Sequence, residues 1–314
     1  MVKVSTREAY GQALVDLGGI NEAVVVLDAD LSKSTRTELF ARRFPHRFFE
    51  MGVAEQNMLG TAAGLSLAGK IPFVSSFAVF ATGRAFEQIR NSIAYPALNV
   101  KIAASHAGVT VGEDGGSHQS VEDISLMRVL PNMTVIVPAD AEETRQAVLA
   151  AVAYHGPVYL RLGRLAVPVL NRNDYRFQIG KASYLREGKD AALIATGLMV
   201  AKALEAAELL SAEGYRVTVI NMATLKPLDT EAIIRAARDT GALVTAEEHS
   251  IIGGLGSAVA EVVAENNPVP LRRVGIPDVF GESGSPDLLL TKYGLTASNL
   301  VTAVKQVIAR KKAY

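Results

Sequence analysis

Short apolar runs alternate with helical patterns through the first half of the chain. Runs rich in β-branched residues predict buried strands at 23–28, 71–77, 100–105, 134–139 and 157–162. Apolar residues with helical spacing predict helices at 6–17, 35–44, 54–69, 83–94, 121–128 and 141–155. This alternation is typical of a mostly parallel sheet with helices on both faces.

The pattern stops at a polar, arginine-rich segment and then resumes. Residues 165–190 show little periodicity, which predicts a linker at 166–188. A second series follows, with strands predicted at 191–197, 215–222, 241–248 and 269–276 and helices at 198–212, 229–239, 254–266 and 296–311. The chain therefore predicts an α/β fold class with two domains, residues 1–165 and 189–314, each with a mostly parallel sheet flanked by helices.

Composition narrows the classes of function without pointing to one. The 314 residues are enough for two domains, and 32 basic residues balance 32 acidic ones, so no global field favours nucleic acid or an acidic membrane. The sequence has no cysteine, which excludes disulfides, thiolate metal sites and cysteine nucleophiles. No signal-peptide core or membrane-length apolar run is present. We expect a soluble cytoplasmic protein.

Polar motifs follow several predicted strands, at the edge of a parallel sheet where ligands bind. They are "DADLSKS" (28–34), "GEDGGSHQS" (112–120) and "RLGR" (161–164) in the first domain, and "EEHSIIGGLGS" (247–257) in the second. The chain contains no P-loop, no GxGxxG at a helix start and no HExxH-type ligand spacing. Their placement predicts a ligand site at the strand ends that uses none of these common motifs.

Individual candidates have ordinary interpretations as well as functional ones. Glu55 begins an Ala/Gly-rich helix, where an acid suits the helix dipole, but a carboxyl group packed there could also exchange a proton with a ligand nitrogen. Phe77 and Phe80, three apart, are typical of core, yet could form a stacking platform at a strand end. Both interpretations of each residue stay open at this point.

The glycine-rich loop and the last strand of the first domain add further candidates. His106, Asp114 and His118 belong to one strand-to-helix loop whose glycines allow side chains to turn inward. Arg161 and Arg164 close the strand at 157–162, where an arginine serves either as an ion-pair partner or as a phosphate clamp.

Taken together, these motifs resemble the transketolase family of thiamine-diphosphate enzymes. The resemblance runs nearly end to end, from about residue 3 to about residue 310, and is carried in order by "STREAY", "DADLSKS", "GVAEQNM", "SFAVF", "GEDGGSHQ", "LRLGR", "LKPLD" and "EEHSIIGGLGSAVAE". It implies a pyrimidine-binding domain followed by a transketolase C-terminal domain. The family's GDG…N metal motif has no match here, because "GEDGG" has no companion asparagine in a suitable setting.

The resemblance therefore implies one subunit of a split enzyme. The diphosphate of thiamine diphosphate and its Mg²⁺ would lie on a separate N-terminal subunit, in an α2β2 heterotetramer, and no metal ligand is assigned to this chain. The implied activity transfers a two-carbon ketol unit from xylulose 5-phosphate to ribose 5-phosphate or erythrose 4-phosphate in the pentose phosphate pathway.

The resemblance also assigns roles to individual residues. Glu55 would hydrogen-bond the aminopyrimidine ring and favour the imino form that removes the cofactor's C2 proton, Phe77 and Phe80 would stack on that ring, and Asp30 would lie near the thiazolium. Asp114 would contact the acceptor's C2 hydroxyl, and His118, the second catalytic residue, the donor's first hydroxyls. The residues implied to grip the sugar phosphate are Arg7, Ser34, His106 and Arg161.

Three alternatives remain open from the sequence. A 2-oxoacid dehydrogenase β-type subunit has a similar length and domain order, but its substrates carry no sugar phosphate for Arg7, Ser34 and Arg161 to bind. A deoxyxylulose-phosphate synthase-like protein shares the glutamate and an arginine. A non-catalytic regulatory subunit is less consistent with retention of Glu55 and both phenylalanines.

Overall fold

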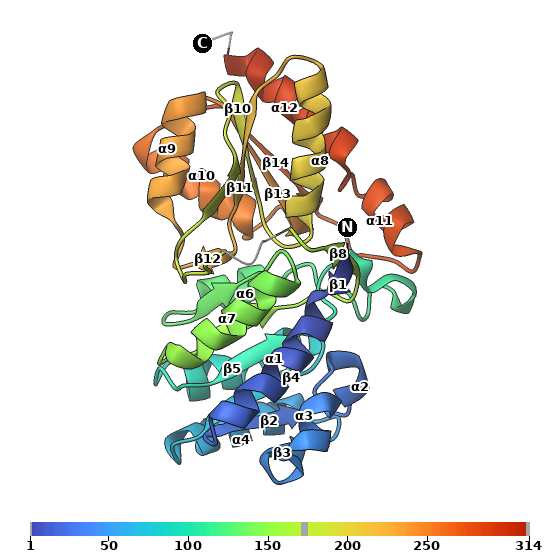
Figure 1. The fold of residues 1–314 in the computed structure, drawn as a ribbon, viewed down its shortest axis with the longest axis vertical. Helices are drawn as coiled ribbons and strands as arrows, with labels where there is room; N and C mark the ends of the chain where they lie inside the picture. Colours follow the sequence, from blue (N-terminus) through green and yellow to red (C-terminus); the bar gives the residue numbers. More distant parts are fainter. Residues whose placement is uncertain (1, 171–174, 312–314) are drawn as a thin grey trace.

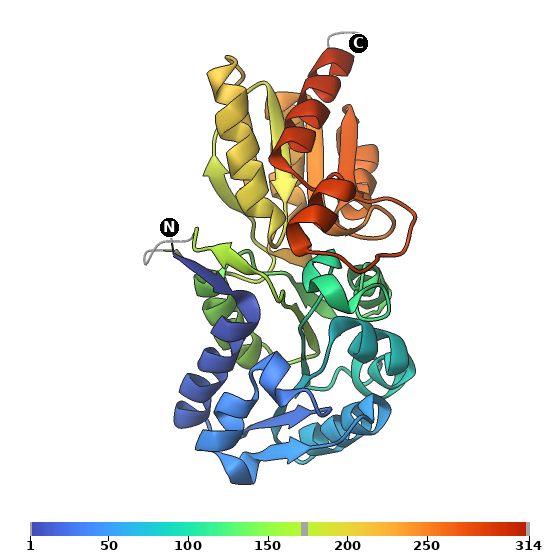
Figure 2. The same cartoon turned by 90° about the vertical axis from the view of Figure 1, so that its right-hand side faces the viewer.

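The computed structural model describes residues 2–170 and 175–311 and consists of two α/β units stacked along the long axis (Figure 1). The first half of the chain forms the lower unit and the second half the upper one, with the N-terminus at their junction and the C-terminus at the far end. Figure 2, turned by 90°, shows the same two-layered stacking with loops of both halves meeting in the middle.

The first unit contains a sheet of seven strands in the order β12-β6-β7-β5-β4-β2-β3. All are parallel except β12, and their bounds are β2 Val24–Asp28, β3 Phe48–Glu50, β4 Ile71–Ser75, β5 Lys101–Ala104, β6 Thr134–Ile136, β7 Val158–Arg161 and β12 Thr224–Lys226. Every residue of β2, β5 and β7 is buried, which explains their apolar character apart from Asp28, Lys101 and Arg161 at the strand ends.

The helices of the first unit are α1 Thr6–Ile20, α2 Ser32–Thr35, α3 Glu38–Arg43, α4 Glu55–Leu67, α5 Phe86–Gln88, α6 Asp123–Val129 and α7 Ala141–Ala153. The helix expected at 83–94 is mostly wider, π-helical turns at Phe80–Arg84 and Ile89–Ala94 on either side of α5. The starts of two long helices follow sequence rules, because Ser5 and Asp140 cap α1 and α7 by accepting the backbone N–H of Glu8 and Glu143.

The second unit contains a five-stranded sheet in the order β14-β13-β10-β11-β9. The bounds are β9 Ser183–Arg186, β10 Ala191–Ala195, β11 Val217–Asn221, β13 Leu243–Ser250 and β14 Leu271–Ile276, with only β9 antiparallel among these described strands. Its helices are α8 Met199–Ala212, α9 Thr230–Thr240, α10 Leu255–Asn266, α11 Pro286–Lys292 and α12 Ala297–Lys311. The α/β fold class and the two parallel-dominated sheets expected from the sequence are confirmed.

Short strands lie outside the predicted series, and one of them, β12, joins the two halves. β8 (Ala166–Pro168) pairs with β1 (Lys3–Ser5), and β9 forms an edge of the second sheet, so the segment expected to be a linker contains two strands. β12 comes from the second half of the sequence but pairs antiparallel with β6 of the first sheet. The halves therefore share backbone hydrogen bonds as well as side-chain contacts.

Candidate active site

The carboxyl ends of β2, β4, β5 and β7 lie along one edge of the first sheet because these strands are parallel and adjacent. The loops that follow them carry most of the residues singled out by the sequence. The start of α1 reaches the same edge, where Thr6 Oγ1 accepts the N–H of Gly163, 2.7 Å away, just after β7. Arg7 is therefore brought beside residues far away in the chain.

Four rings from two loops form one aromatic cluster. Phe77 stacks on Phe80 with ring centroids 5.7 Å apart and an angle of 12°, and on His106 at 3.8 Å and 18°. His118 lies edge-on to Phe80 at 5.3 Å. Phe77 is buried while Phe80 and His118 are partly exposed, so the cluster offers a ring surface to a ligand as well as to the core.

Glu55 lies at the end of this cluster and is buried, as its place at the start of α4 suggested. Its Oε1 is 3.0 Å from Nη1 of Arg84, whose guanidinium lies 4.1 Å from the Phe80 ring centroid. Arg84 was not a candidate from the sequence, although it follows Phe80 by four residues, the spacing at which helical side chains meet. A buried carboxylate and an aromatic face are thereby connected.

Arg7 and His106 form the other end of the cluster. Nη1 of Arg7 donates to the Ser34 carbonyl at 2.9 Å and lies 3.4 Å from Nε2 of His106, whose Nδ1 is 2.8 Å from Ser105 Oγ. Because arginine only donates, Nε2 of His106 accepts and its Nδ1 carries the proton. His106 is therefore an acceptor for Arg7 in this arrangement.

The electrostatics of this end favour an anion. Burial lowers the pKa of His106 to about 3, with further contributions from Arg7 and Arg164, so the ring is neutral at pH 7. The pKa of Arg7 is also lowered, first by burial and then by the positive charges of Arg36 and Arg164. Arginines that repel one another at a half-buried site are suited to bind a phosphate or sulfonate.

Arg164 belongs to this group; the sequence left it open as an ion-pair partner or a phosphate clamp, and the resemblance gave the clamp role to Arg161 instead. It lies 3.4 Å from the Asp114 carboxylate and donates to the Val111 carbonyl, on the loop that also carries His106 and His118. It follows the end of β7 by three residues, and that position beyond the strand was the signal in the sequence.

Arg161 is placed differently from the expectation. It is the last residue of β7 and is buried, and its Nε and Nη2 bind both oxygens of the fully buried Asp123 at 2.8 and 3.1 Å. Nη2 also donates to the Glu248 carbonyl at 2.9 Å. Arg161 therefore has an ion-pair partner, which is the alternative role that the sequence left open. Among the described residues, no hydrogen bond or ion pair joins Arg161 to Arg7 or His106.

Asp30 and Ser34 lie in the loop after β2, which is organised by a buried carboxylate. Asp28 accepts from the Leu31 N–H and from the hydroxyls of Thr35 and Thr37, and burial raises the pKa of Asp28 to about 6. Asp30 has a left-handed backbone (φ 63°), is exposed, and donates its N–H to Glu50. This loop fixes the Ser34 carbonyl against Arg7 and leaves the Asp30 side chain open.

The arrangement forms one continuous path from Ser34 through Arg7, His106, Phe77, Phe80 and Arg84 to Glu55. An aromatic face beside a buried carboxylate fits an aminopyrimidine, and the arginines at the other end fit an anionic group. Within residues 2–170 and 175–311 no cluster of three or more histidine, aspartate or glutamate side chains is arranged to hold a metal. None of the helices in that described part is long and apolar enough to cross a bilayer.

Two family models match the chain in succession. Residues 2–169 match the transketolase pyrimidine-binding domain and residues 180–300 the transketolase C-terminal domain. The chain belongs to the transketolase family. The resemblance in the motifs is thereby confirmed over nearly its whole length.

Several relatives of this chain are separate transketolase subunits or sections, and they align with it over nearly their whole length. A Methanocaldococcus jannaschii protein, provisionally named a transketolase C-terminal section, is 50% identical over 99% of this chain and 100% of its own. A 6-deoxy-6-sulfo-D-fructose transketolase subunit from a Clostridium species is 49% identical over 97% of this chain and 95% of its own. A solved structure described as a split-gene transketolase in an inactive beta4 tetramer has a TM-score of 0.91 and 59% identity, covering 99% of this chain and all of that one.

Proposed function

We propose that this protein is the C-terminal subunit of a two-chain transketolase. With an N-terminal subunit it would transfer a two-carbon ketol unit from a ketose phosphate to an aldose phosphate, using thiamine diphosphate and Mg²⁺ whose diphosphate end is held by the partner. The observation that carries this proposal is the continuous path from the Arg7 anion site to Glu55. Domain limits of 1–165 and 189–314 and a cytoplasmic location belong to the same proposal.

Each residue of the path has a part in this function. When bound, thiamine diphosphate supplies the nucleophilic carbon that carries the two-carbon unit. Glu55 would hold and exchange a proton at a pyrimidine ring nitrogen, while Phe77 and Phe80 would stack on the ring and exclude water. His118, which touches the Phe80 ring, would contact the donor's hydroxyl groups at that ring's edge.

The substrate phosphate would bind at the opposite end. Arg7 and Arg164 would hold it together with Ser34, and His106 would orient the Arg7 guanidinium by accepting from it. Asp114, next to Arg164, would contact the acceptor's C2 hydroxyl. We place Arg164 in this role instead of Arg161, because the Arg161 guanidinium is committed to Asp123. Asp30 keeps its proposed place near the thiazolium, with its side chain exposed at the same sheet edge.

The partner and the substrates are tested together by reconstitution. The chain is mixed with a subunit that carries the diphosphate-binding domain, thiamine diphosphate and Mg²⁺, and ketol transfer is measured from xylulose 5-phosphate to ribose 5-phosphate and erythrose 4-phosphate. Two further donors separate the alternatives: 6-deoxy-6-sulfo-D-fructose, named in one relative, and pyruvate, the type of substrate used by the oxoacid dehydrogenase and deoxyxylulose-phosphate synthase alternatives.

Transfer from xylulose 5-phosphate supports the proposal, and preference for the sulfonated sugar would keep the reaction but change the substrate, since a sulfonate is also an anion. Turnover of pyruvate alone, or of none of the four sugars, would overturn it.

A further inference from the structure

The loop after β5 enters the left-handed region of the backbone at four positions, three of which are glycines and one of which is His106. His106 has φ 58°, and Gly108, Gly112 and Gly115 have φ of 82°, 86° and 76°. The left-handed region is uncommon for residues other than glycine, so His106 in particular needs support from its surroundings. This loop carries three residues of the proposed substrate site, His106, Asp114 and His118.

The C-terminal domain supplies much of that support. Glu248 at the end of β13 accepts the Thr110 N–H through Oε1 at 2.7 Å, and Gln119 Nε2 donates to the Glu282 carbonyl at 2.9 Å. Just beyond the loop, the Ser250 N–H donates to the Val121 carbonyl at 2.7 Å. The domain that carries none of the proposed substrate residues therefore holds the loop that carries three.

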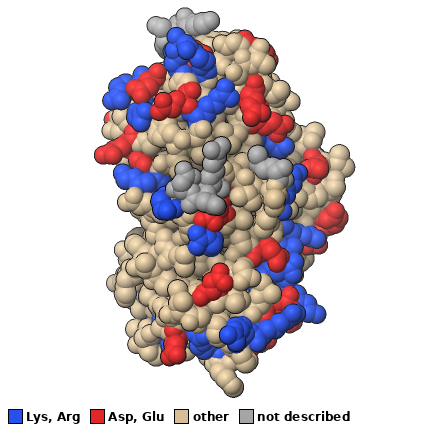
Figure 3. Space-filling model, viewed as in Figure 1, with Lys and Arg blue, Asp and Glu red and all other residues tan. Residues whose placement is uncertain are grey.

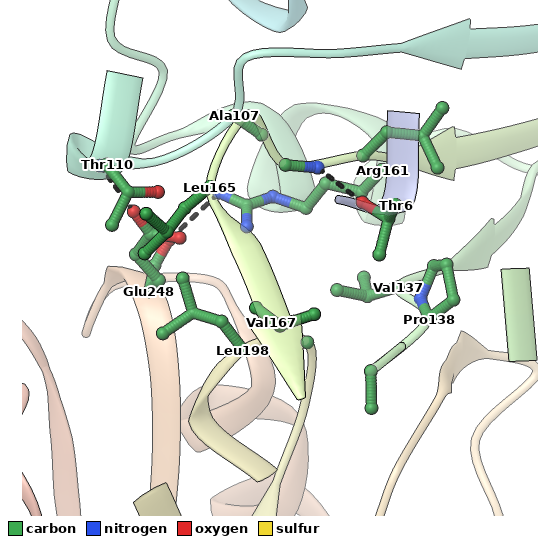
Figure 4. Close-up of a pocket in the computed structure, with 14 residues that line it drawn as sticks. Thr6, Ala107, Thr110, Val137, Pro138, Arg161, Leu165, Val167, Leu198 and Glu248 are labelled. Carbon is green, nitrogen blue, oxygen red and sulfur yellow. Dashed lines mark hydrogen bonds between the residues drawn. The ribbon is translucent and has the colours of Figure 1, made fainter. Parts of the chain in front are cut away.

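Glu248 makes the one contact of the three that joins an acidic side chain of the C-terminal domain to the loop backbone. A Cβ atom added at Gly108 would come within 2.2 Å of its carboxyl carbon, so the loop backbone lies directly on the carboxyl group. Figure 4 shows Glu248 reaching towards Thr110 beneath Arg161, at the wall of a small cavity.

Burying this carboxyl group is unfavourable. Burial raises the pKa of Glu248 to about 7, with Arg161 and the Thr110 N–H acting in the opposite direction and Asp123 in the same one. The proposed mechanism gives Glu248 no role at a reacting atom. Its carboxyl group contacts the loop backbone at Gly108 and Thr110, and its carbonyl accepts from Arg161.

We propose that Glu248 is a positioning residue for the substrate, which sets the path of the loop between His106 and Asp114 by accepting the Thr110 N–H. The contact lies four residues from each of them, so a shift there changes the distance between the two ends of the substrate site. Displacements of about 1 Å at such sites cost up to about 10²-fold in rate.

The first test measures the loop directly, in the chain as it exists, by amide hydrogen exchange. Glu248→Met keeps the volume but removes the acceptor, so exchange at Thr110 and its neighbours should rise at least about ten-fold, the value of one hydrogen bond to a charged group. Glu248→Gln keeps an oxygen for the same N–H and should restore slow exchange.

The control is the preceding residue, which is equally buried. Glu247 accepts from the Leu255 and Gly256 N–H groups at 2.7 Å each, within the C-terminal domain. Glu247→Met should speed exchange at the start of α10 and leave the loop at 106–118 unchanged. Equal effects of both variants on the loop would mean that Glu248 only stabilises its domain, and would overturn the inference.

The second test measures turnover in the reconstituted complex, and it rests on the proposed function. Below the melting temperature of each variant, Glu248→Met should lower kcat/KM for the sugars by 10- to 100-fold, with cofactor C2 proton exchange at the wild-type rate because Glu55 is not on the loop. If Glu248→Met keeps the wild-type kcat/KM, or if its rate of C2 proton exchange falls as much as its kcat/KM, Glu248 is not a positioning residue for the substrate.

If Glu248→Met does not fold, Gly108→Ala takes its place, because the added Cβ displaces the loop from the Glu248 carboxyl group. It should also lower kcat/KM for the sugars and leave the rate of C2 proton exchange unchanged. A wild-type complex without ketol transfer would instead contradict the proposed function, and hydrogen exchange would still decide the inference.

Discussion

Glu55 is buried because it begins α4 at the edge where β2 and β4 end, and its one ion-pair partner among the described residues is Arg84. Arg84 is itself half-exposed and lies on the Phe80 ring. The carboxyl group is thus held beside an aromatic face, with a cation on its solvent side. That is the local environment in which a glutamate can exchange a proton with a stacked ring.

Glu55→Gln tests this role in the reconstituted complex. The amide cannot exchange the proton, so deprotonation of the cofactor at C2 should slow by about 10²- to 10⁴-fold, with the melting temperature nearly unchanged. Proton–deuterium exchange at C2 followed by NMR is the measurement. Glu87→Gln, an exposed glutamate nearby, is the control. Exchange at the wild-type rate in Glu55→Gln would remove Glu55 from the proton transfer.

Arg161 and Arg164, three residues apart, should behave in opposite ways. Arg164→Ala should raise KM for ribose 5-phosphate by about 10- to 150-fold, the value of a charge-assisted hydrogen bond of about 1.5–3 kcal/mol, and barely affect glycolaldehyde, which has no phosphate. Arg161→Ala leaves Asp123 buried and unpaired, so it should lower the free energy of unfolding by about 3–5 kcal/mol and reduce activity equally with both acceptors. An Arg161 variant that is stable but selectively impaired with ribose 5-phosphate would reverse the two assignments.

At the scale of elements, the free backbone N–H groups at the start of a helix bind a buried carboxylate. Glu247 in β13 accepts two backbone N–H groups at the start of α10, yet burial raises the pKa of Glu247 to about 7. The helix start favours the charged form, but here the loss of water outweighs it. Stability therefore depends on the protonation of this side chain.

The sign of that dependence follows from proton binding. Between about pH 4.5 and 7 the folded chain keeps the Glu247 proton that the unfolded chain has lost, so its contribution is full below that window and falls as the pH rises through it. Glu247→Gln does not titrate. The stability of the wild type relative to Glu247→Gln should therefore fall between pH 5 and 8, by on the order of 3 kcal/mol.

Urea unfolding of both proteins at pH 5 and 8 measures this difference. Glu265→Gln, on the exposed face of the same helix, is the control and should show no such change. A constant difference between wild type and Glu247→Gln at the two pH values would contradict the raised pKa.

At the scale of the whole molecule, the two halves are joined by β12 in the first sheet and by the contact of β13 with the loop after β5. Acidic and basic side chains are interspersed on the face seen in Figure 3, in line with the balanced net charge. The proposed site lies along the carboxyl edge of the first sheet, with its pyrimidine end at Glu55 and its phosphate end at Arg7.

We expect the isolated chain to bind thiamine diphosphate weakly and to show no ketol transfer, because the proposal places the diphosphate and Mg²⁺ on the partner subunit. Activity should appear on titration with the partner subunit and saturate at a fixed ratio of the two chains. Calorimetry with thiamine diphosphate, before and after addition of the partner, separates binding from turnover. Robust turnover by the purified chain alone would refute the two-chain proposal.

The sequence by itself determined the fold class and most of the long elements. Parallel strands that are buried on both faces are rich in apolar residues, so runs such as residues 24–27 and Ala191–Ala195 are visible without a structure. It also placed the polar motifs at strand ends, because parallel strands end at one edge. Short strands such as β12 were missed, since three residues carry no periodicity and pair only in the tertiary structure.

Only the tertiary structure decided which of two similar side chains does what. Arg161 and Arg164 are alike in sequence, but one ends inside the sheet against Asp123 and the other passes beyond it towards Asp114. Arg84 and Glu248 gain their roles from partners 29 and 138 residues away, Glu55 and Thr110. Local spacing fixes which face of a strand or helix a residue occupies, whereas the partner across that face depends on how the two units pack.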